Sequence, residues 1–517
     1  MIDRTAERAE FLTRVRLGAT VPVARAFVCD SLTPVTLLAR MRRSGAECFL
    51  LESVAGGESV ARYTFLGCAP IARLSIEGAA VHQERAGRRL PAGSDPLHAL
   101  EQLVTANRFE PDPELAPLSA GAVGYLGYDA VRAFEKIPDR HPRVGAMPDG
   151  VFLLFDAVVA FDHPRQRLLL LTNVTVDDPQ EKERQVDAAI VRLDRLEAFL
   201  TASDQEVEAP RAVSAEADPG SRESFAPIMP KEQFLAAVEK AKEAILAGDA
   251  YQIVLSQRWT SPLEVDPFDV YRALRMLNPS PYLFYLETRD GTIFGASPEM
   301  LVRCRGGVAE TRPIAGTAPR GRSHAEDETL ADALLVDPKE RAEHVMLVDL
   351  ARNDLGRVCA IGSVEVPRYA VIERYSHVQH IVSEVKGKLA PGRTSTDVLA
   401  ACFPAGTLTG APKIRAMELI DELEACRRGV YGGVAGYLDA AGNLDMAIAI
   451  RTAVVEKGIC RVQAGAGIVA DSVAEKEYAE AESKAAALFR AIDLARSWSK
   501  ESTRHSRIAD RKSQVSR

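Results

Sequence analysis

The apolar positions in the first part of the chain follow a pattern that predicts strands. Between residues 46 and 170, short runs of β-branched and aromatic residues are separated by glycine, proline and polar residues, as in CFLLESV, YTFLGC and GAVGYLGYD. Runs of this length and composition, bounded by turn residues, are typical of β-strands. The period then changes in residues 181–200, where apolar side chains recur at helical spacing and predict a helix: Ile190, Leu193, Leu196 and Leu200.

A polar stretch separates this region from the rest of the chain. Residues 201–224 are rich in Ala, Glu, Ser and Pro and contain no apolar run, which is typical of a linker. After Pro230, the segment KEQFLAAVEKAKEAILAGD predicts an amphipathic helix that stops at Gly248. Strands, hairpins and helices then alternate to about residue 491. The pattern predicts a sheet-rich α+β protein whose larger part is C-terminal.

These signals divide the chain into four stretches. We expect an N-terminal domain in residues 1–205, a linker in 206–229, a C-terminal domain in 230–495 and a tail in 496–517. The last residues, KESTRHSRIADRKSQVSR, are basic and polar, so the tail is expected to be disordered.

Composition narrows the class of protein. A net charge of −8 and a pI near 5.8 argue against binding to nucleic acid or to a membrane surface. The 8 cysteines form no CxxC pair, which suits a reducing compartment. The charged start has no apolar signal segment, and no apolar run approaches the roughly 18 residues that span a bilayer. We therefore expect a soluble, cytoplasmic protein.

Two predicted helices each carry a pair of glutamates three residues apart. Glu340 and Glu343 lie in DPKERAEHVMLVDLARND, whereas Glu477 and Glu480 lie in EKEYAEAESKAAALFRAI, one turn before Lys484. Residues at this spacing share a helix face. Two such faces could form a site for Mg²⁺, which binds a few carboxylates and keeps water and substrate oxygens as its other ligands. Alternatively, each pair is part of a solvated helix surface.

Three polar residues stand out in the apolar strands near the C-terminus. His380 shares a strand face with Val378 and Val382, so it is either a satisfied core residue or a catalytic one. Arg451 lies in the apolar run AIAIRTAVV and needs a carboxylate or phosphate opposite it, from a ligand or from an internal ion pair. Tyr431 offers a hydroxyl among glycines.

Two glycine-containing segments could approach a ligand closely. In QAGAGIVADS, Gly465 and Gly467 would let a ligand approach the backbone, unless they only serve hairpin geometry. In CFPAGTLTGAPKIRAMELIDE, glycines precede Lys413, but the spacing does not match a phosphate-binding loop.

These segments, taken in order, resemble a known family. DPKERAEHVMLVDLARNDLGRV, RYSHVQHIVSEVKG, FPAGTLTGAPKIRAMELI, YGGVAGYL, AIAIRT, QAGAGIVADS and EYAEAESKA are similar to motifs of the chorismate-utilising enzymes, and most closely to those of anthranilate synthase large subunits (component I). The resemblance covers roughly residues 45–495. It implies two intertwined domains built on large antiparallel sheets with helices outside, and therefore an α+β fold.

The resemblance also implies roles for particular residues. Magnesium ligands match Glu343 and Glu480, with Glu340 and Glu477 close by, some of them acting through water. His380 matches the catalytic histidine, and we expect Thr407 to be a catalytic residue as well. The positions that match or adjoin substrate contacts are Gly406, Thr407, Tyr431, Arg451, Gly465, Gly467 and Lys484.

Chorismate carries two carboxylates, which suggests a role for the glycine-containing loop. The AGTLTGAPK segment leads into a helix N-terminus, where free N–H groups favour negative charge. We expect this loop to form a wall near a substrate carboxylate. The ring carboxylate would bind magnesium, and Arg451 and Tyr431 would hold the enolpyruvyl carboxylate, helped by backbone N–H groups near Gly467.

Two positions bear on which reaction the chain performs. Water-using relatives carry a lysine base where this chain has Gln252, and aminodeoxychorismate synthases carry a nucleophilic lysine where it has Ala315. Without either lysine the nucleophile must come from outside, and ammonia fits because it needs no base. The expected reaction is that of an anthranilate synthase. An aminodeoxychorismate or aminodeoxyisochorismate synthase, or a non-catalytic ligand-binding scaffold, remains as an alternative.

The resemblance implies a protein partner and a regulator. No cysteine has the Gly-x-Cys-x-Gly context of a glutamine amidotransferase, so we expect a separate amidotransferase subunit to supply ammonia. The LLES and NPSPYLFYL segments match elements that line a site for feedback inhibition by L-tryptophan, unless both are simply core strands. The matching residues in the LLES segment are Leu51, Glu52 and Ser53, and those in the other segment are Pro281, Tyr282 and Leu283.

Overall fold

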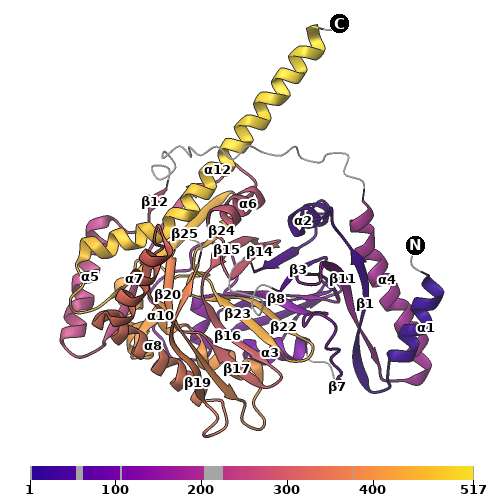
Figure 1. Ribbon diagram of the computed structural model, residues 1–517, viewed down its shortest axis with the longest axis horizontal. Coiled ribbons are helices and arrows are strands. Elements are labelled where there is room, and N and C mark those ends of the chain that lie inside the picture. The colour runs from indigo at the N-terminus through magenta and orange to yellow at the C-terminus, as the bar shows by residue number, and fades with distance from the viewer. Residues whose placement is uncertain (1–2, 54–61, 105–107, 203–224, 376–377, 516–517) are drawn as a thin grey trace.

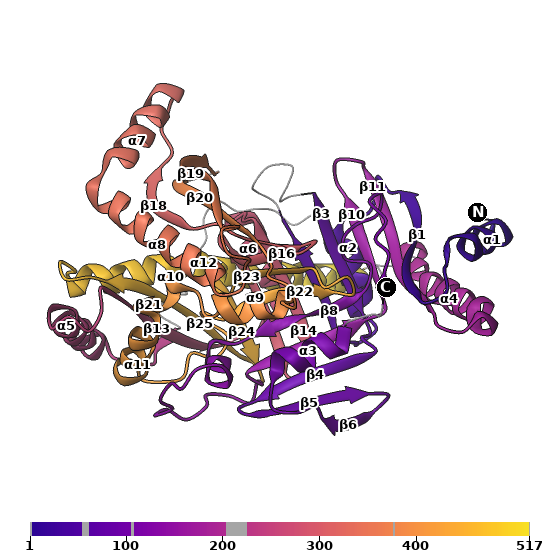
Figure 2. The same ribbon diagram turned by 90° about the horizontal axis from the view of Figure 1, so that it is seen from below.

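The computed structural model describes residues 3–53, 62–104, 108–202, 225–375 and 378–515, with side chains described to residue 499 (Figure 1). Most of the linker expected at residues 206–229 therefore lies outside the described residues. The described chain forms two large sheets with helices outside them (Figures 1 and 2). The predicted α+β class, with large antiparallel sheets and outer helices, is confirmed.

The first sheet has 13 strands in the described residues. Its strands, in spatial order, are β12 (Ala226–Pro227), β13 (Gln252–Pro262), β25 (Ile459–Ile468), β24 (Thr452–Glu456), β15 (Gly291–Ser297), β14 (Tyr282–Thr288), β2 (Cys48–Glu52), β3 (Tyr63–Cys68), β10 (Ala157–Asp162), β11 (Arg167–Val176), β1 (Ala19–Val28) and β7 (Arg108–Phe109), with β21 (Gly410–Ala411) beside β13. Neighbours in this sheet are antiparallel, apart from the short parallel pair of β1 and β7.

The second sheet has 12 strands in the described residues. Its strands, in spatial order, are β18 (Ile314–Pro319), β20 (Val378–Lys388), β17 (Val308–Thr311), β16 (Met300–Arg305), β23 (Leu444–Ile448), β22 (Val434–Asp439), β8 (Gly121–Leu126), β9 (Gly150–Phe155), β4 (Ala72–Glu77), β5 (Ala80–Arg85) and β6 (Arg88–Pro91), with β19 (Glu365–Arg374) beside β20. Its strands pair antiparallel throughout.

Each sheet takes strands from both sides of the predicted linker. The first sheet joins β2 to β14, and the second joins β8 to β22. This interleaving corresponds to the intertwined arrangement that the family resemblance implies. The linker thus separates two stretches of the sequence, but it does not separate the two sheets, because each sheet contains strands from before and after it.

The two sheets face each other across an apolar core. Phe49 of β2 packs edge-on against Phe155 of β9, with ring centroids 4.7 Å apart, and Tyr125 of β8 and Phe284 of β14 belong to the same buried cluster. Full burial of such a side chain contributes roughly 1.5–3 kcal/mol. The inner faces of both sheets are therefore held together by side chains from strands far apart in the sequence.

Helices cover the outer faces of the sheets. Their bounds are α1 (Arg4–Arg14), α2 (Pro34–Arg42), α3 (Pro96–Val104), α4 (Lys182–Thr201), α5 (Lys231–Leu246), α6 (Pro267–Leu277), α7 (His324–Val336), α8 (Pro338–Gly356), α9 (Ser395–Cys402), α10 (Gly406–Thr409), α11 (Lys413–Leu423) and α12 (Ala474–Val515), with 3₁₀ turns at Tyr128–Ala133 and Pro179–Glu181. Asp337 caps α8, because its carboxylate accepts hydrogen bonds from the amides of Lys339 and Glu340.

The C-terminal stretch extends the last helix. Residues 496–515 continue helix α12, which leaves the body of the molecule in Figure 1, whereas the expectation that residues 496–517 are disordered stays a prediction. The physical reason lies in the sequence, since residues 474–515 contain no proline or glycine and a helix that has already started extends at little cost.

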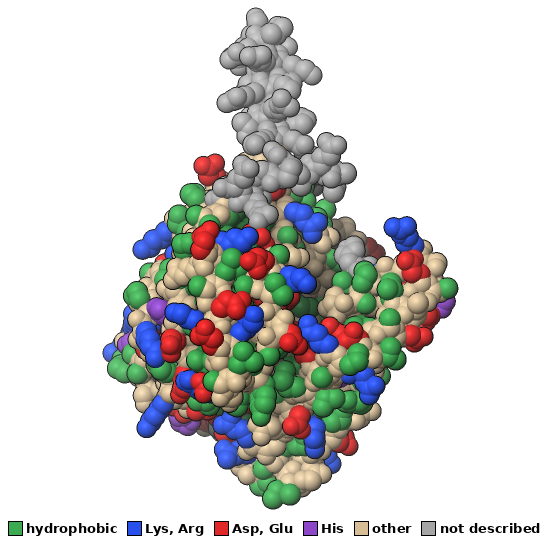
Figure 3. All heavy atoms as spheres, turned by 90° about the vertical axis from the view of Figure 1, so that its left-hand side faces the viewer, with side chains coloured by type: hydrophobic (Ala, Val, Ile, Leu, Met, Phe, Trp, Pro, Cys, Tyr) green, Lys and Arg blue, Asp and Glu red, His purple; other side chains and the backbone are tan. Residues whose placement is uncertain are grey.

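The molecular surface mixes charges of both signs. On the face shown in Figure 3, Lys and Arg side chains are interspersed with Asp and Glu, and neither sign covers the face. Among the described residues, no helix combines the length and the apolar character needed to cross a bilayer.

The chain crosses between the sheets at two places that matter for the site. Pro298 and Glu299 connect β15 of the first sheet to β16 of the second, and Ala449–Arg451 connects β23 of the second sheet to β24 of the first. Arg451 has a positive φ of 50°, and its carbonyl accepts a hydrogen bond of 3.1 Å from the amide of Ala296. The two crossings therefore lie beside each other.

Candidate active site

A cavity of about 570 Å³ brings nearly all the predicted site residues together. It is bordered by the sheet crossings, by β13, β20 and β25, and by helices α8 and α12. The predicted residues that line it are Glu340, Glu343, His380, Thr407, Tyr431, Arg451, Gly465, Gly467, Glu477, Glu480 and Lys484. Gln252 and Ala315, which stand where related enzymes carry a lysine, line the same cavity. We name it the active-site cavity.

One predicted residue does not line this cavity. Gly406 lines a small neighbouring space, and a Cβ there would lie 1.9 Å from Cδ2 of Leu350 on α8. A larger residue at this position would require the side chain of Leu350 to move. The assignment of Gly406 as a substrate-binding residue stays a prediction.

The loop before α11 contributes less than expected. Thr407 and Leu408 line the cavity, whereas the ammonium group of Lys413 lies 2.9 Å from Asp354 and 3.2 Å from the carbonyl oxygen of Cys402. The start of α11 is thus tied to the end of α8, and its residues do not line the cavity. A hydroxyl from the loop, and not the N-terminus of a long helix, faces the site.

The four glutamates come from two helices that face the same space. Burial is the main cause that raises the pKa of Glu340, and the negative charge of Glu343 is the next. Glu480, on the other helix, adds to this rise in pKa. Burial raises the pKa of Glu477 as well, and Glu480 adds to the effect. All four carboxylates line one cavity, so the two glutamate pairs face a common space.

The donor set fits a hard cation such as Mg²⁺ by its chemistry. All four side chains offer oxygen, and their mutual repulsion would be relieved by a positive charge. In the described part of the chain no three His, Cys, Asp or Glu side chains lie close enough to form a complete metal group. The glutamates therefore could supply one or two direct ligands, which is common for Mg²⁺, while water and substrate oxygens complete the shell.

Arg451 is the principal cation without a partner in this cavity. Its side chain is half-buried, and loss of hydration lowers the pKa of its guanidinium. Among the described residues no carboxylate forms an ion pair with it, so the alternative of an internal ion pair does not hold. A desolvated guanidinium of this kind is stabilised by an anion, and its planar fork matches a carboxylate.

The hydrogen bonds of His380 select one tautomer of its imidazole ring. Its Nδ1 lies 2.8 Å from the carbonyl oxygen of Gly316 and 3.1 Å from Oγ1 of Thr317. A carbonyl oxygen only accepts, so Nδ1 carries the proton and Nε2 keeps a lone pair, as assigned from this network. Burial lowers the pKa of His380, which keeps the imidazole neutral near pH 7. The ring can therefore accept a proton at Nε2.

Glu299 is a residue that the sequence analysis missed. It lies at the first sheet crossing, lines the cavity and accepts a hydrogen bond of 3.0 Å from the hydroxyl of Thr407. Desolvation raises the pKa of Glu299 to about 7, although Thr407 and Lys484 oppose the shift. The available signal was weak: a carboxylate directly after the buried strand TIFGAS, in ASPEM.

The glycine-rich strand contributes backbone and also packing. A Cβ at Gly467 would lie 2.6 Å from Nε2 of Gln252, and one at Gly465 would lie 2.4 Å from the carbonyl oxygen of Leu255. Lys484 donates to the carbonyl oxygen of Gly465 at 3.0 Å and pairs with Glu480 at 2.7 Å. Gly467 therefore keeps space at the cavity wall, whereas Gly465 is required by the neighbouring strand.

Tyr431 presents a neutral hydroxyl to the cavity. Burial raises its pKa to about 12, and the guanidinium of Arg428 lies 5.7 Å from its ring centroid. The phenol therefore stays protonated near neutral pH and can donate a hydrogen bond to an anion held by Arg451.

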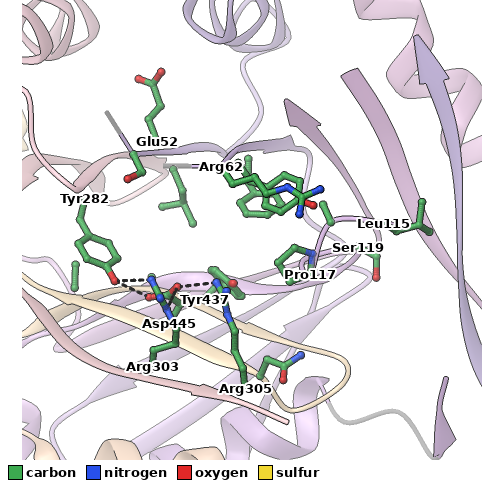
Figure 4. Close-up of a pocket in the computed structure, with 18 of the residues that line it drawn as sticks. Glu52, Arg62, Leu115, Pro117, Ser119, Tyr282, Arg303, Arg305, Tyr437 and Asp445 are labelled. Atoms are coloured by element: carbon green, nitrogen blue, oxygen red, sulfur yellow. Dashed lines mark hydrogen bonds and ion pairs between the residues drawn. The ribbon is translucent and has the colours of Figure 1, made fainter. Parts of the chain in front are cut away.

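A second cavity, of about 500 Å³, lies between the two sheets (Figure 4). We name it the inter-sheet cavity. All six residues expected at a regulatory site line it: Leu51, Glu52, Ser53, Pro281, Tyr282 and Leu283. The two segments they come from are adjacent, because β2 pairs with β14 in the first sheet.

Within this cavity, two of the predicted side chains differ in what they offer. The carboxylate of Glu52 points away from Tyr282 in Figure 4, and it accepts a hydrogen bond of 2.6 Å from Tyr271 and pairs with Arg275 at 2.9 Å. The hydroxyl of Ser53 is buried and has no hydrogen-bond partner among the described residues. Ser53 is therefore free to meet a ligand, whereas Glu52 serves the fold.

Comparison with known proteins places the chain in a family. Residues 46–490 match the family model described as chorismate binding enzyme. The protein named anthranilate synthase component 1 from Mycobacterium tuberculosis (strain ATCC 25618 / H37Rv) is 46% identical over 504 residues, which covers 95% of this chain and 96% of the relative. A protein of the same name from Streptomyces coelicolor is 45% identical over 486 residues, covering 94% and 91%.

Solved structures give the same result. The crystal structure of anthranilate synthase component I from Streptococcus pneumoniae TIGR4 superposes with a TM-score of 0.71 at 37% identity, covering 90% of this chain and 99% of that one. The menaquinone-specific isochorismate synthase MenF from Escherichia coli shares the fold, with a TM-score of 0.66 at 19% identity and coverage of 94% and 99%. These matches confirm the resemblance seen in the motifs, and the chain belongs to the family of chorismate-binding enzymes.

Proposed function

We propose that the chain is the large subunit of an anthranilate synthase. It aminates chorismate with ammonia and eliminates pyruvate to give anthranilate, the first committed step of tryptophan biosynthesis. The observation that carries the proposal is the unpaired guanidinium of Arg451 in the same cavity as the carboxylates of α8 and α12. A dianionic substrate bound together with a divalent cation would neutralise both sets of charge.

The cavity lining favours ammonia as the nucleophile. Gln252 and Ala315 offer no amine and no base, so neither can activate water or attack the ring. Ammonia attacks through its own lone pair and needs no protein base. An aminodeoxychorismate or aminodeoxyisochorismate synthase remains the alternative, and the product distinguishes them, because only anthranilate formation is accompanied by an aromatic fluorescent product and pyruvate.

The residues of this chain can orient both ends of chorismate. Arg451 and Tyr431 hold the enolpyruvyl carboxylate, with the backbone amide near Gly467 beside them. Glu343 and Glu480, with Glu340 and Glu477 close by, would hold Mg²⁺. Bound there, the ion supplies Lewis-acid stabilisation of charge on the ring carboxylate.

The proton steps follow from the two titratable groups at the cavity wall. When ammonia attacks C2, both ring double bonds shift, from C1=C2 to C1=C6 and from C5=C6 to C4=C5, and the C4 hydroxyl leaves, taking a proton from Glu299 to depart as water. The nitrogen on C2 is left as an ammonium group. A carboxyl group with a pKa of about 7 still holds a proton near neutral pH. Thr407 fixes the orientation of that carboxyl.

The second step makes the ring aromatic. Nε2 of His380 accepts the proton from C2, the electron pair of that bond forms the C2=C3 double bond, and the bond between C3 and the enolpyruvyl oxygen breaks. The leaving enolate takes up a proton from solvent to become pyruvate, and the imidazolium of His380 returns its proton to solvent. The hydrogen bond from Nδ1 to Gly316 stabilises the imidazolium that forms for a moment on His380.

A partner subunit and a regulator complete the proposal. A glutamine amidotransferase subunit (component II) supplies ammonia, and L-tryptophan binds in the inter-sheet cavity as a feedback inhibitor. We place the enzyme in the cytoplasm, in keeping with its free cysteines.

One experiment tests the proposal as a whole. The purified chain is incubated with chorismate and Mg²⁺ at alkaline pH, with either ammonium or glutamine, and anthranilate fluorescence and pyruvate are measured. Turnover is expected with ammonium, not with glutamine, and is expected to stop with a chelator and to fall with L-tryptophan. A chain that binds chorismate but releases no pyruvate would be a scaffold, and amination without pyruvate would indicate an aminodeoxyisochorismate synthase.

A further inference from the structure

Two neighbouring strands, β16 and β23, run from one cavity to the other: residues within them line the inter-sheet cavity, and residues that adjoin their ends line the active-site cavity. At one end, Glu299 directly before β16 and Arg451 shortly after β23 face the active-site cavity. At the other end, Arg303 of β16 and Asp445 of β23 line the inter-sheet cavity. Within the described lining, no residue is shared by the two cavities, but β16 and β23 connect the residues that line one cavity to those that line the other.

The two strands are paired along this length. Arg303 lies opposite Asp445, Met300 lies opposite Ala447, and the amide of Ile448 donates to the carbonyl oxygen of Glu299 at 3.0 Å. Four residues of strand span about 13 Å. A hydrogen-bonded pair resists sliding, because a slip of one residue would turn every side chain to the opposite face. The register of the pair shifts between Met300 and Val302, so we expect a movement at the inter-sheet end to reach Glu299 across this irregular part of the ladder.

A polar cluster fixes the inter-sheet end of this pair to the other sheet. The hydroxyl of Tyr282, on β14 of the first sheet, donates to Oδ1 of Asp445 at 3.0 Å and accepts from Nη2 of Arg303 at 3.1 Å (Figure 4). Nε of Arg303 also donates to Oδ2 of Asp445 at 2.9 Å. Arg303 and Asp445 are buried, so these bonds act where water does not compete.

The same tyrosine is close to the active site along the first sheet as well. Tyr282 pairs with Ser297 in the ladder of β14 and β15, and Pro298 and Glu299 follow immediately. Tyr282 therefore contacts the β16–β23 pair from one side and the crossing that carries Glu299 from the other.

We infer that the cluster of Tyr282, Asp445 and Arg303 positions Glu299 and Arg451, and that a ligand in the inter-sheet cavity changes turnover through it. These three are positioning residues: they do not line the active-site cavity, and they act through the β16–β23 pair. The regulatory half of the inference rests on the proposed binding of L-tryptophan, whereas the positioning half does not.

The test measures coupling between the two cavities as an equilibrium ratio. The Kd of L-tryptophan is determined by titration calorimetry with and without saturating chorismate, in the presence of Mg²⁺ and without ammonium or glutamine, so that no amination occurs. Coupling between sites is reciprocal and typically amounts to roughly a 5- to 150-fold change in affinity. In the wild-type chain we expect chorismate to raise the Kd of tryptophan by a factor in that range.

The informative variant is Tyr282→Phe, which keeps the ring and removes the bridging hydroxyl. We expect tryptophan still to bind, but the ratio of the two Kd values should fall towards 1. Asp445→Asn removes the charge that holds Arg303 and should act in the same direction. The matched control is Tyr369→Phe, which makes the same chemical change at an exposed residue of β19 that lines neither cavity, and should keep the wild-type ratio.

A kinetic measurement tests the positioning without tryptophan. With ammonium as the substrate, Tyr282→Phe should lower kcat/KM for chorismate by at least about threefold, because small displacements of catalytic groups slow reactions. The thermal midpoint of Tyr282→Phe is recorded to monitor its stability. Tyr369→Phe should keep the wild-type kcat/KM and thermal midpoint. If the wild-type chain does not bind tryptophan, the proposed regulation is wrong. The kinetic measurement then decides by itself whether the cluster positions Glu299 and Arg451. An unchanged Kd ratio in both cluster variants, or an unchanged kcat/KM, overturns the corresponding half.

Discussion

The two cavities differ in how their charges are satisfied. Every charged side chain that lines the inter-sheet cavity has a partner in the structure: Glu52 with Arg275, Arg62 with Asp162, Asp112 with Arg14, and Arg303 and Arg305 with Asp445. In the active-site cavity, Arg451, Glu340 and Glu343 have no ion-pair partner among the described residues.

This difference indicates what each cavity binds. Desolvated charges without partners are costly, and a fold retains them where a ligand supplies the missing charge. The active-site cavity therefore suits an anionic substrate together with a cation. The inter-sheet cavity, with its charges already paired and apolar side chains such as Leu51 and Phe284 in its wall, suits a ligand with a large apolar ring.

The strongest test of the comparison removes the unpaired cation. For Arg451→Ala we expect kcat/KM for chorismate to fall on the order of 10² to 10³, because truncating one member of a desolvated charge pair costs roughly 2–5 kcal/mol. Steady-state kinetics with ammonium measure the loss. Arg352→Ala on the exposed face of α8 is the control and should retain wild-type kinetics. A variant of Arg451 with unchanged kcat/KM would mean that its missing partner is not the substrate.

The next test addresses the protonated carboxyl group. Glu299→Gln should lower kcat about 10²-fold, at the lower end of the range for a general acid. The acid form is the active one and the pKa is about 7, so the acid-dependent rate should fall as pH rises through that value. The rate is measured against pH at a constant concentration of free ammonia. The variant should lack this fall, and a fall that persists would assign it to another group.

A smaller effect is expected for the neutral imidazole. His380→Ala should slow pyruvate release about 10- to 10²-fold, less than for a fully lost base, because water can enter the space left by the ring. Pyruvate is followed with chorismate and ammonium. Release at the wild-type rate would show that His380 moves no proton in a step that limits turnover.

The smallest effect should appear in the inter-sheet cavity and only with its ligand. Ser53→Phe should raise the tryptophan concentration needed for half-inhibition at least about tenfold, equivalent to roughly 1.4 kcal/mol, because the ring fills space beside Leu51. The variant should still convert chorismate with ammonium. Exposed Ser94→Phe is the control and should be inhibited like the wild type. Unchanged sensitivity in Ser53→Phe would place the tryptophan site elsewhere.

Part of the fold could be predicted from local pattern. The strands in CFLLESV and YTFLGC and the helix before Gly248 follow from side-chain periodicity and turn residues, and β2, β3 and α5 lie where these signals are. The strand β1 and helices α1 and α2 were not predicted. The interleaving of the sheets could not be read from the sequence without the resemblance, since pairing of β2 with β14 joins residues more than two hundred positions apart.

The sequence by itself determined the chemical groups of the site. Glutamate pairs at helical spacing, an arginine in an apolar strand and the absence of lysine at positions 252 and 315 are properties of the chain, and together with the resemblance of its motifs to a known family they predicted the kind of ligand. These groups can be read from the sequence because the identity of a side chain does not depend on the fold.

Only the tertiary structure decided which of these groups lack a partner and where they meet. It showed that Lys413 binds Asp354, that Gly406 lies against Leu350, and that Glu299 reaches the cavity with a raised pKa. Burial, desolvation and ion pairing arise from contacts between segments distant in sequence, and no local pattern records them. The link between the two cavities through β16 and β23 belongs to the same class, because it exists only once those strands are paired.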